Sequence, residues 1–191
     1  MSKFGIYRND RCALLLENGP ELACAVLLCM ARCTCVPINI QQTSPEIRAE
    51  LHGTGCKALI VQEGQDLHWV RSIIEGLPVR VLQLVPDSIT AGIFSLVPWD
   101  AATLAASEAG VEQCARKQEL GNETGHGFNS PLDTALVLHT SGTSGNKKKV
   151  PYTLETLCVG AACIIDSWGL VAEDVCLNMM PLFHVGGITR N

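Results

Sequence analysis

The chain has 191 residues, of which 47% are hydrophobic and 17% are charged, and its formal net charge is −5. This apolar content is too high for a disordered chain, and the length suits one domain or slightly more. The acidic balance argues against broad electrostatic binding to nucleic acid, although one local basic cluster can still meet phosphates.

Predicted helices and strands alternate over the first 85 residues. A helix begins at residues 18–21, where Pro20 suits the first helical position and Glu21 suits the positive end of the helix dipole. A second helix begins with a capping box formed by Thr43 and Glu46. In chain order the elements are helix Leu22–Ala31, strand Thr34–Ile40, a helix from Thr43 to about His52, strand Ala58–Val61, helix Leu67–Ile74 and strand Val79–Val85. The alternation predicts an α/β fold with mostly parallel sheets and flanking helices.

The pattern weakens between about residues 86 and 130, which we interpret as an irregular linker that includes an irregular helix at Ala101–Ala115. Order returns with a strand at Thr134–His139, a helix capped by Thr153 and a strand at Cys176–Met180. We therefore expect an N-terminal α/β subdomain over residues 1–130. Residues 131–191 then hold a glycine-rich loop and the start of a second α/β subdomain that is truncated at its C-terminus.

The cysteines and the apolar stretches indicate the compartment. Most of the ten cysteines lie inside apolar helix or strand patterns, which is typical of reduced thiols buried in a cytoplasmic protein. Cys33 and Cys35 form the one close pair, but no further ligands complete a metal site, so we expect none. The longest apolar stretch, Leu22–Ala31, is about half of the ~20 residues that a membrane span needs. We expect neither a transmembrane segment nor a secretory signal.

One loop combines the residue types that a triphosphate site requires. Thr140–Lys149 contains four hydroxyl side chains, two glycines and three lysines directly after a predicted buried strand. Glycines let successive backbone N–H groups point at one anion, hydroxyls donate hydrogen bonds to phosphate oxygens, and lysine supplies compact positive charge. The same composition also fits a flexible hydrophilic hairpin with solvated lysines. We call Thr140–Lys149 the glycine–lysine loop.

Two other phosphate motifs are not matched. The Walker A pattern fails because Lys147, and not glycine, stands five residues after Gly142. Residues Gly53–Ala58 match a relaxed dinucleotide-binding pattern, but they precede a predicted strand where that motif must follow one. We interpret Gly53–Ala58 as the turn that ends a helix.

Leu138–Val150 resembles the phosphate-binding loop of adenylate-forming (AMP-binding) enzymes, which include acyl-CoA synthetases, luciferases and the adenylation domains of peptide synthetases. Two further segments resemble this superfamily in the same order: residues 18–39 resemble its first helix and strand, and Pro181–Gly187 resembles its PxFH segment. The resemblance covers most of the chain. It implies part of the N-terminal lobe of an acyl-CoA synthetase-like fold.

The resemblance also implies a reaction. A small-molecule carboxylate attacks the α-phosphate of ATP, with Mg²⁺, and releases pyrophosphate. The acyl-adenylate then passes its acyl group to the thiol of CoA or of a carrier phosphopantetheine. The residues implied to wrap the β- and γ-phosphates are Thr140, Ser141, Gly142, Thr143, Ser144 and Gly145, with Lys148 neutralising the departing pyrophosphate. His184 is implied to line the acyl and adenylate pocket, where it either steers the carboxylate or is simply a packed histidine.

Two departures from the family pattern leave alternatives open. The family usually has Pro, Lys and Gly where this chain has Lys147, Lys148 and Lys149, so the lysine that meets phosphate is not assigned. The family's catalytic unit is also far longer, and the chain lacks its adenine pocket, Mg²⁺ carboxylate, ribose aspartate and mobile C-terminal domain. We expect the chain to be the N-terminal part of a carboxylate-adenylating ligase and to be inactive alone.

The first alternative is a naturally truncated, non-catalytic module that binds nucleotide, or a partner through surface exposed by truncation. The second is a doubly wound domain with an unrelated ligand, in which the glycine–lysine loop is only a surface hairpin. A structure tests the second alternative, because ligands of such sheets bind at the carboxyl ends of the strands.

Overall fold

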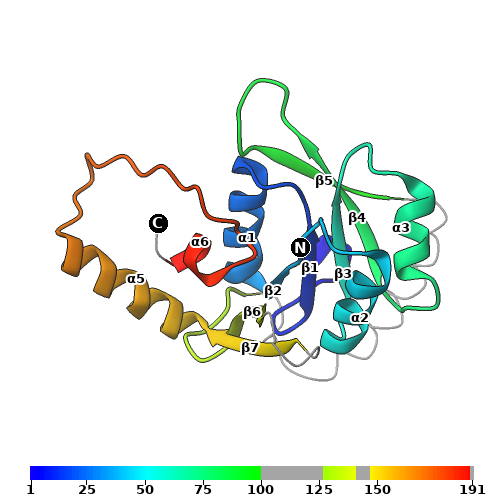
Figure 1. Ribbon diagram of the computed structural model, residues 1–191, viewed down its shortest axis with the longest axis horizontal. Helices are drawn as coiled ribbons and strands as arrows, with labels where there is room; N and C mark the ends of the chain where they lie inside the picture. Colours follow the sequence, from blue (N-terminus) through cyan, green and yellow to red (C-terminus); the bar gives the residue numbers. More distant parts are fainter. Residues whose placement is uncertain (100–126, 141–146, 190–191) are drawn as a thin grey trace.

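The computed structural model describes residues 1–99, 127–140 and 147–189, and within them seven strands form one sheet (Figure 1). The strands are β1 (Arg11–Leu15), β2 (Thr34–Pro37), β3 (Ala58–Gln62), β4 (Arg80–Pro86), β5 (Phe94–Pro98), β6 (Thr134–Thr140) and β7 (Lys148–Thr153). They lie in the order β5-β4-β3-β1-β2-β6-β7. Strands β4, β3, β1, β2 and β6 are parallel, whereas β5 and β7 pair antiparallel at the two ends. The predicted mostly parallel α/β fold is confirmed.

Helices cover both faces of this sheet. They are α1 (Pro20–Arg32), α2 (Ser44–Thr54), α3 (Leu67–Ile74), α5 (Leu154–Trp168) and the short α6 (Val185–Thr189), with a 3₁₀ turn at Ser2–Phe4. Figure 1 shows α1 on one side of the sheet and α2 and α3 on the other. Alternation along β1 divides the core accordingly: Leu14 packs on the α1 side and Leu15 on the side of α2 and α3. Central strands buried on both faces explain the continuous apolar runs of the sequence.

The helix starts follow the predicted caps. At α2 the backbone N–H of Thr43 donates to the Glu46 carboxylate at 2.8 Å, which completes the predicted capping box. At α1 Pro20 occupies the first turn, as predicted. The turn after α2 ends at Gly55, which adopts a φ of 62° and satisfies the last carbonyls of the helix. The interpretation of Gly53–Ala58 as a helix-ending turn that leads into β3 is therefore confirmed.

Three sequence interpretations require correction. Strand β1 occupies the centre of the sheet, yet the sequence analysis began its first element only at residue 18. Part of the region interpreted as irregular is ordered, because Phe94–Pro98 form β5 against β4. The strand predicted at Cys176–Met180 is absent, and Leu177 and Met179 are more than four-fifths exposed. Apolar composition does not make a strand where no neighbouring strand supplies hydrogen-bond partners, and none lies beside 176–180 in the described part.

The segment that follows residue 126 is joined to the first part of the chain by buried and charged contacts. The Asn129 amide donates to the carbonyls of Met30 and Cys33, each at 2.8 Å, at the end of α1. The Arg8 guanidinium donates to Ser130 and Asp133 and holds the pKa of the Asp133 carboxyl below its ordinary value. Strands β6 and β7 thus extend the same sheet as β1–β5. The proposed subdomain boundary near residue 130 stays a prediction, and the helix predicted at 101–115 lies outside the described residues.

The cysteines in the described ranges, nine of the ten, are free thiols. Cys12, Cys29, Cys33 and Cys35 are fully buried in the core beneath α1. They fill space there as small apolar side chains. No described helix combines the length and the apolar character needed to cross a membrane.

Candidate functional site

The glycine–lysine loop leaves the sheet at its carboxyl edge. Strand β6 runs parallel to β2, with Leu136 paired to Cys35, so Thr140 and Pro37 end their strands at the same edge. Ligands of open α/β sheets bind at this edge. The loop also connects β6 to the antiparallel β7, in which Lys148 pairs directly with Thr140. The predicted phosphate ligands Ser141, Gly142, Thr143, Ser144 and Gly145 lie outside the described residues, so the structure places only the two ends of the loop.

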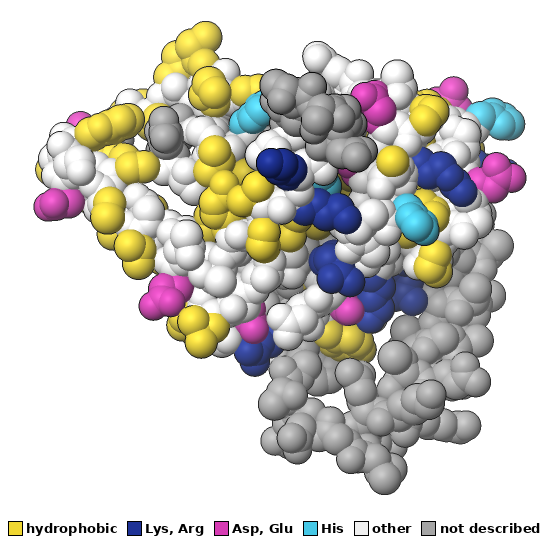
Figure 2. Space-filling view, turned by 60° about the horizontal axis from the view of Figure 1, so that its bottom comes forward, with side chains coloured by type: hydrophobic (Ala, Val, Ile, Leu, Met, Phe, Trp, Pro, Cys, Tyr) yellow, Lys and Arg dark blue, Asp and Glu magenta, His cyan; other side chains and the backbone are white. Residues whose placement is uncertain are grey.

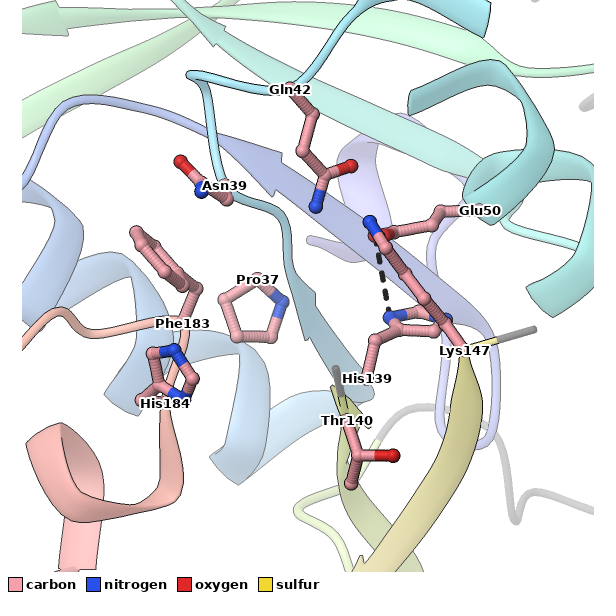
Figure 3. A pocket seen from close by; sticks show the side chains of 9 residues that line it. All are labelled: Pro37, Asn39, Gln42, Glu50, His139, Thr140, Lys147, Phe183 and His184. Atoms are coloured by element: carbon pink, nitrogen blue, oxygen red, sulfur yellow. Dashed lines mark hydrogen bonds and ion pairs between the residues drawn. The ribbon is translucent and has the colours of Figure 1, made fainter. Parts of the chain in front are cut away.

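A cavity of about 190 Å³ opens beside Thr140. Figure 3 shows that its walls come from the ends of β2 and β6, from α2, from the start of β7 and from the PxFH segment. Its lining residues are Pro37, Asn39, Gln42, Glu50, His139, Thr140, Lys147, Phe183 and His184. The structure therefore brings Thr140 and His184, two residues singled out from sequence, to one cavity. A second cavity of about 200 Å³ continues past His184 to Val150 and Tyr152.

The PxFH segment is held against the first part of the chain. The Leu182 backbone N–H donates to the Asn18 side chain at 2.9 Å, and the His184 N–H donates to the Pro181 carbonyl at 3.0 Å. Gly187 packs so closely on Pro181 that a Cβ atom at position 187 would collide with the Pro181 carbonyl. These contacts explain why the motif needs its glycine, and they place the exposed His184 ring at the mouth of both cavities.

The three lysines of the loop point to two different faces of the sheet. The Lys147 ammonium lies 2.7 Å from the Glu50 carboxylate, and the Lys149 ammonium donates to the Gly53 carbonyl, so both attach to α2. Side chains alternate along a strand, and directly paired residues share a face, so Lys148 lies on the opposite face with Thr140. Within the described residues the side-chain ammonium of Lys148 makes no hydrogen bond or ion pair. Figure 2, in which the bottom of Figure 1 is turned toward the viewer, shows basic side chains gathered beside a group of hydrophobic side chains.

Glu50 and His139 form a buried polar pair that the sequence analysis missed. Their side chains are only 6% and 7% exposed, and His139 Nδ1 lies 3.3 Å from Glu50 Oε2. Burial lowers the pKa of His139 below its ordinary value, and the charges of Lys147 and Lys149 lower it further, against the attraction of Glu50. The imidazole is therefore neutral at neutral pH, and the ion pair of Glu50 is the one with Lys147. The buried residues of α2 follow helical spacing as Ile47, Glu50, Leu51 and Thr54, and a glutamate in such a stripe was the available signal.

The lowered pKa of His139 predicts an acid-sensitive fold. Unfolding exposes the imidazole, which then gains a proton more readily than in the folded protein. The free energy of unfolding therefore falls as pH drops below about 6.5, and it levels off once pH is below the pKa of His139 in the folded protein. We expect His139→Leu to flatten this dependence between about pH 7 and pH 5 in urea unfolding. His68→Gln, which removes an exposed imidazole on α3, serves as the control. Equal slopes for His139→Leu and the unsubstituted chain would contradict the assignment.

Within ranges 1–99, 127–140 and 147–189 no group of three or more His, Cys, Asp or Glu side chains converges as metal ligands. The carboxylate that lies nearest the loop, Glu50, is already bonded to Lys147. The fit to a polyphosphate is better, because Lys148 and Thr140 share a face at the carboxyl edge of the sheet.

Comparison with known proteins decides the family. The family model described as "AMP-binding enzyme" matches residues 1–190. The chain belongs to the AMP-binding enzyme family. The resemblance read from the glycine–lysine loop is thereby confirmed.

Similar proteins of the AMP-binding family are about three times longer. The chain is 28% identical over 189 residues to an oxalate–CoA ligase of Arabidopsis thaliana, covering 98% of this chain and 33% of that protein. It is 25% identical over 190 residues to the long-chain-fatty-acid–CoA ligase FadD13 of Mycobacterium tuberculosis, covering 99% of this chain and 33% of the relative. The crystal structure of ATP-bound MatB from Rhodopseudomonas palustris matches with a TM-score of 0.71 at 22% identity, over 98% of this chain and 33% of that one. The chain therefore spans about a third of the length of these relatives.

Proposed function

We propose that this chain is the N-terminal part of an ATP-dependent ligase that adenylates a carboxylate and then transfers the acyl group to a thiol. The observation that carries the proposal is the position of Thr140 and Lys148. They lie opposite each other on one face at the carboxyl edge of the sheet. Thr140 also lines a cavity that reaches His184. Family membership and CoA-ligase relatives support the same reaction class.

The proposed roles follow from the chemistry of each side chain. Lys148 places a positive charge where the β- and γ-phosphates would leave as pyrophosphate, and the Thr140 hydroxyl is a hydrogen-bond donor beside it. The proposal assigns the remaining phosphate contacts to Ser141, Gly142, Thr143, Ser144 and Gly145. His184 lies at the mouth of the cavity, where its imidazole can orient the attacking carboxylate. Bound Mg²⁺ would neutralise phosphate charge.

The proposal names the acid substrate and the thiol acceptor only by chemical class. The relatives are named for acids as different as oxalate and a long-chain fatty acid, so the proposal extends only to the carboxylate class. The relatives named as CoA ligases favour CoA over a carrier phosphopantetheine as the acceptor. Because the chain spans a third of their length, we expect residues 1–191 alone to be inactive.

Carboxylate-dependent exchange of labelled pyrophosphate into ATP tests this function. The gene product at its natural length should exchange pyrophosphate only when a suitable acid is present, and a panel should include short diacids, aromatic acids and fatty acids. Residues 1–191 expressed alone should show no exchange with the same acids. An absence of exchange for every acid, in a folded protein with the loop intact, would refute the proposed reaction.

Exposed apolar side chains favour a second candidate function. Helix α5 buries only Leu157, while Ile165 and Trp168 are more than half exposed and Val175 is almost fully exposed. Apolar patches of this kind bind partners or promote aggregation. If the gene product has this length, it would act as a non-catalytic module that binds nucleotide or a protein partner. Intact mass of the natural protein distinguishes the two candidates, and a monomer with one cooperative thermal transition at this length would argue against the module.

The proposal places the protein in a reducing compartment and does not include nucleic acid among its binding partners. Nine described cysteines are free thiols, which supports a cytoplasmic location. The net charge of −5 gives no broad positive surface for a nucleic acid backbone, and the lysines of the loop are better suited to a small polyphosphate.

A further inference from the structure

Glu50 contacts the residue that precedes the glycine–lysine loop and one lysine within that loop. One carboxylate oxygen, Oε1, accepts from the Lys147 ammonium at 2.7 Å, on the side where the chain enters β7. The other, Oε2, lies 3.3 Å from Nδ1 of His139, which directly precedes Thr140 at the end of β6. Figure 3 shows the Glu50 side chain reaching from α2 toward both residues. A single side chain of α2 therefore lies against His139 at the end of β6 and against Lys147 just before β7.

Helix α2, which carries this carboxylate, is anchored in the core. Helix α2 packs through Ile47 and Leu51, which are both fully buried, and its first turn is fixed by the capping box at Thr43. Lys149 provides a second attachment, because its ammonium donates to the Gly53 carbonyl in the last turn of α2. A cation suits that end of a helix, where the carbonyls carry partial negative charge. The start of β7 is thus bonded to α2 at two points.

The buried carboxylate also requires its partner. A glutamate that is only 6% exposed is costly to keep charged unless a cation neutralises it, and His139 is neutral. Lys147 is therefore committed to Glu50 and is not free to meet a ligand. Lys148, on the opposite face, carries no such commitment in the described part of the chain.

We propose that Glu50 is a positioning residue for the start of β7: by holding Lys147 against α2, it leaves Lys148 as the lysine that meets the triphosphate. The inference rests on the proposed function, since the ligand of the loop is taken to be ATP. Glu50 touches no nucleotide in this scheme and acts only through Lys147 and His139. The sequence left open which of the three lysines meets phosphate. The bonds of Lys147 and Lys149 to α2 leave this role to Lys148 on the other face of β7.

Calorimetric binding of ATP and of AMP to the gene product at its natural length tests this role. AMP lacks the β- and γ-phosphates, so loss of loop positioning weakens ATP binding without an equal loss for AMP. We expect Glu50→Gln to weaken ATP binding about tenfold, a coupling of ordinary size between neighbouring sites. AMP affinity should stay within about twofold, the scatter of independent substitutions.

Further variants separate positioning from simple structural damage. Glu50→Gln combined with Lys147→Gln should bind ATP no more weakly than the poorer single variant, because the two residues act as one unit. Glu63→Gln removes an exposed carboxylate just after β3, at the same edge of the sheet, and should leave both affinities unchanged. If Glu50→Gln lowers the yield of folded protein, Lys147→Gln tests the same ion pair from its half-buried partner.

Three outcomes would overturn the inference. Equal losses for ATP and AMP would mean that Glu50 has only a structural role. Unchanged or stronger ATP binding by Glu50→Gln would mean that the ion pair does not position the loop. If Lys148→Met leaves ATP affinity unchanged, the assignment of the loop in the proposed function fails, and this inference fails with it. A loss with Lys148→Met but none with Glu50→Gln rejects the positioning role alone.

Discussion

Replacing Lys148 with methionine is expected to lower carboxylate-dependent ATP–pyrophosphate exchange by about 100- to 1,000-fold, the usual effect of removing one preorganised group that stabilises charge in a transition state. The charge that develops on the departing pyrophosphate has no other free lysine of this loop beside it, since Lys147 and Lys149 are bonded to α2. Methionine keeps most of the apolar length of the side chain, so packing changes little.

The neighbouring lysines supply matched controls for Lys148→Met. Lys147→Met should act only through loop position, and we expect an exchange rate lowered by about tenfold. Lys149→Met removes one bond to the Gly53 carbonyl and should have the smallest effect. Exchange by the gene product at its natural length is the measurement. A larger loss with Lys147→Met or Lys149→Met than with Lys148→Met would reverse the assignment of the lysines.

The parts of the fold that local patterns encode were predictable. The capping box at Thr43, the proline at the start of α1 and the apolar run of β3 each depend on adjacent residues, and all three form as predicted. Strand β1 was missed because it is held between β2 and β3, which both come later in the chain. Strand β5 pairs with the preceding strand β4, but its residues are alternately half-buried and exposed, so it lacks the continuous apolar run of a central strand. The apolar run at 176–180 shows the converse, since it has strand composition but lacks a neighbouring strand in the described part.

The candidate site divides in the same way. The glycine–lysine loop and the PxFH segment are motifs, and sequence alone located both. Which lysine faces the ligand depends on the register of β7 against β6, in which Lys148 pairs with Thr140 and Lys149 with His139. Glu50 is 97 residues from Lys147 in the chain, so their ion pair exists only once α2 and β7 have packed. Such a contact cannot be read from local spacing.

The fold also depends on one buried amide, and Asn129→Ala is expected to destabilise the protein by about 2–4 kcal/mol. The Asn129 side chain is buried and donates to the Met30 and Cys33 carbonyls at the end of α1. Alanine would leave both carbonyls without this donor, and each unsatisfied buried acceptor costs roughly 1–3 kcal/mol. Guanidinium unfolding followed by circular dichroism measures the loss.

Asn129→Asp distinguishes the lost donors from lost volume, because aspartate has the size of asparagine but presents carboxylate oxygens to the two carbonyls. We expect it to destabilise the fold at least as much as alanine at neutral pH, with partial recovery in acid when a protonated carboxyl can donate one bond. Asn178→Ala removes one donation, to the Gly187 carbonyl, and one acceptance, from the Met180 N–H in an exposed place, and should cost only about 1 kcal/mol because neither bond is fully buried. If Asn129→Asp were as stable as the unsubstituted protein, the side-chain hydrogen bonds of Asn129 would not be what holds the residues after 126 against α1. The attachment of β6, and with it the place of the glycine–lysine loop, would then rest mainly on the strand ladder with β2 and the Arg8–Asp133 ion pair.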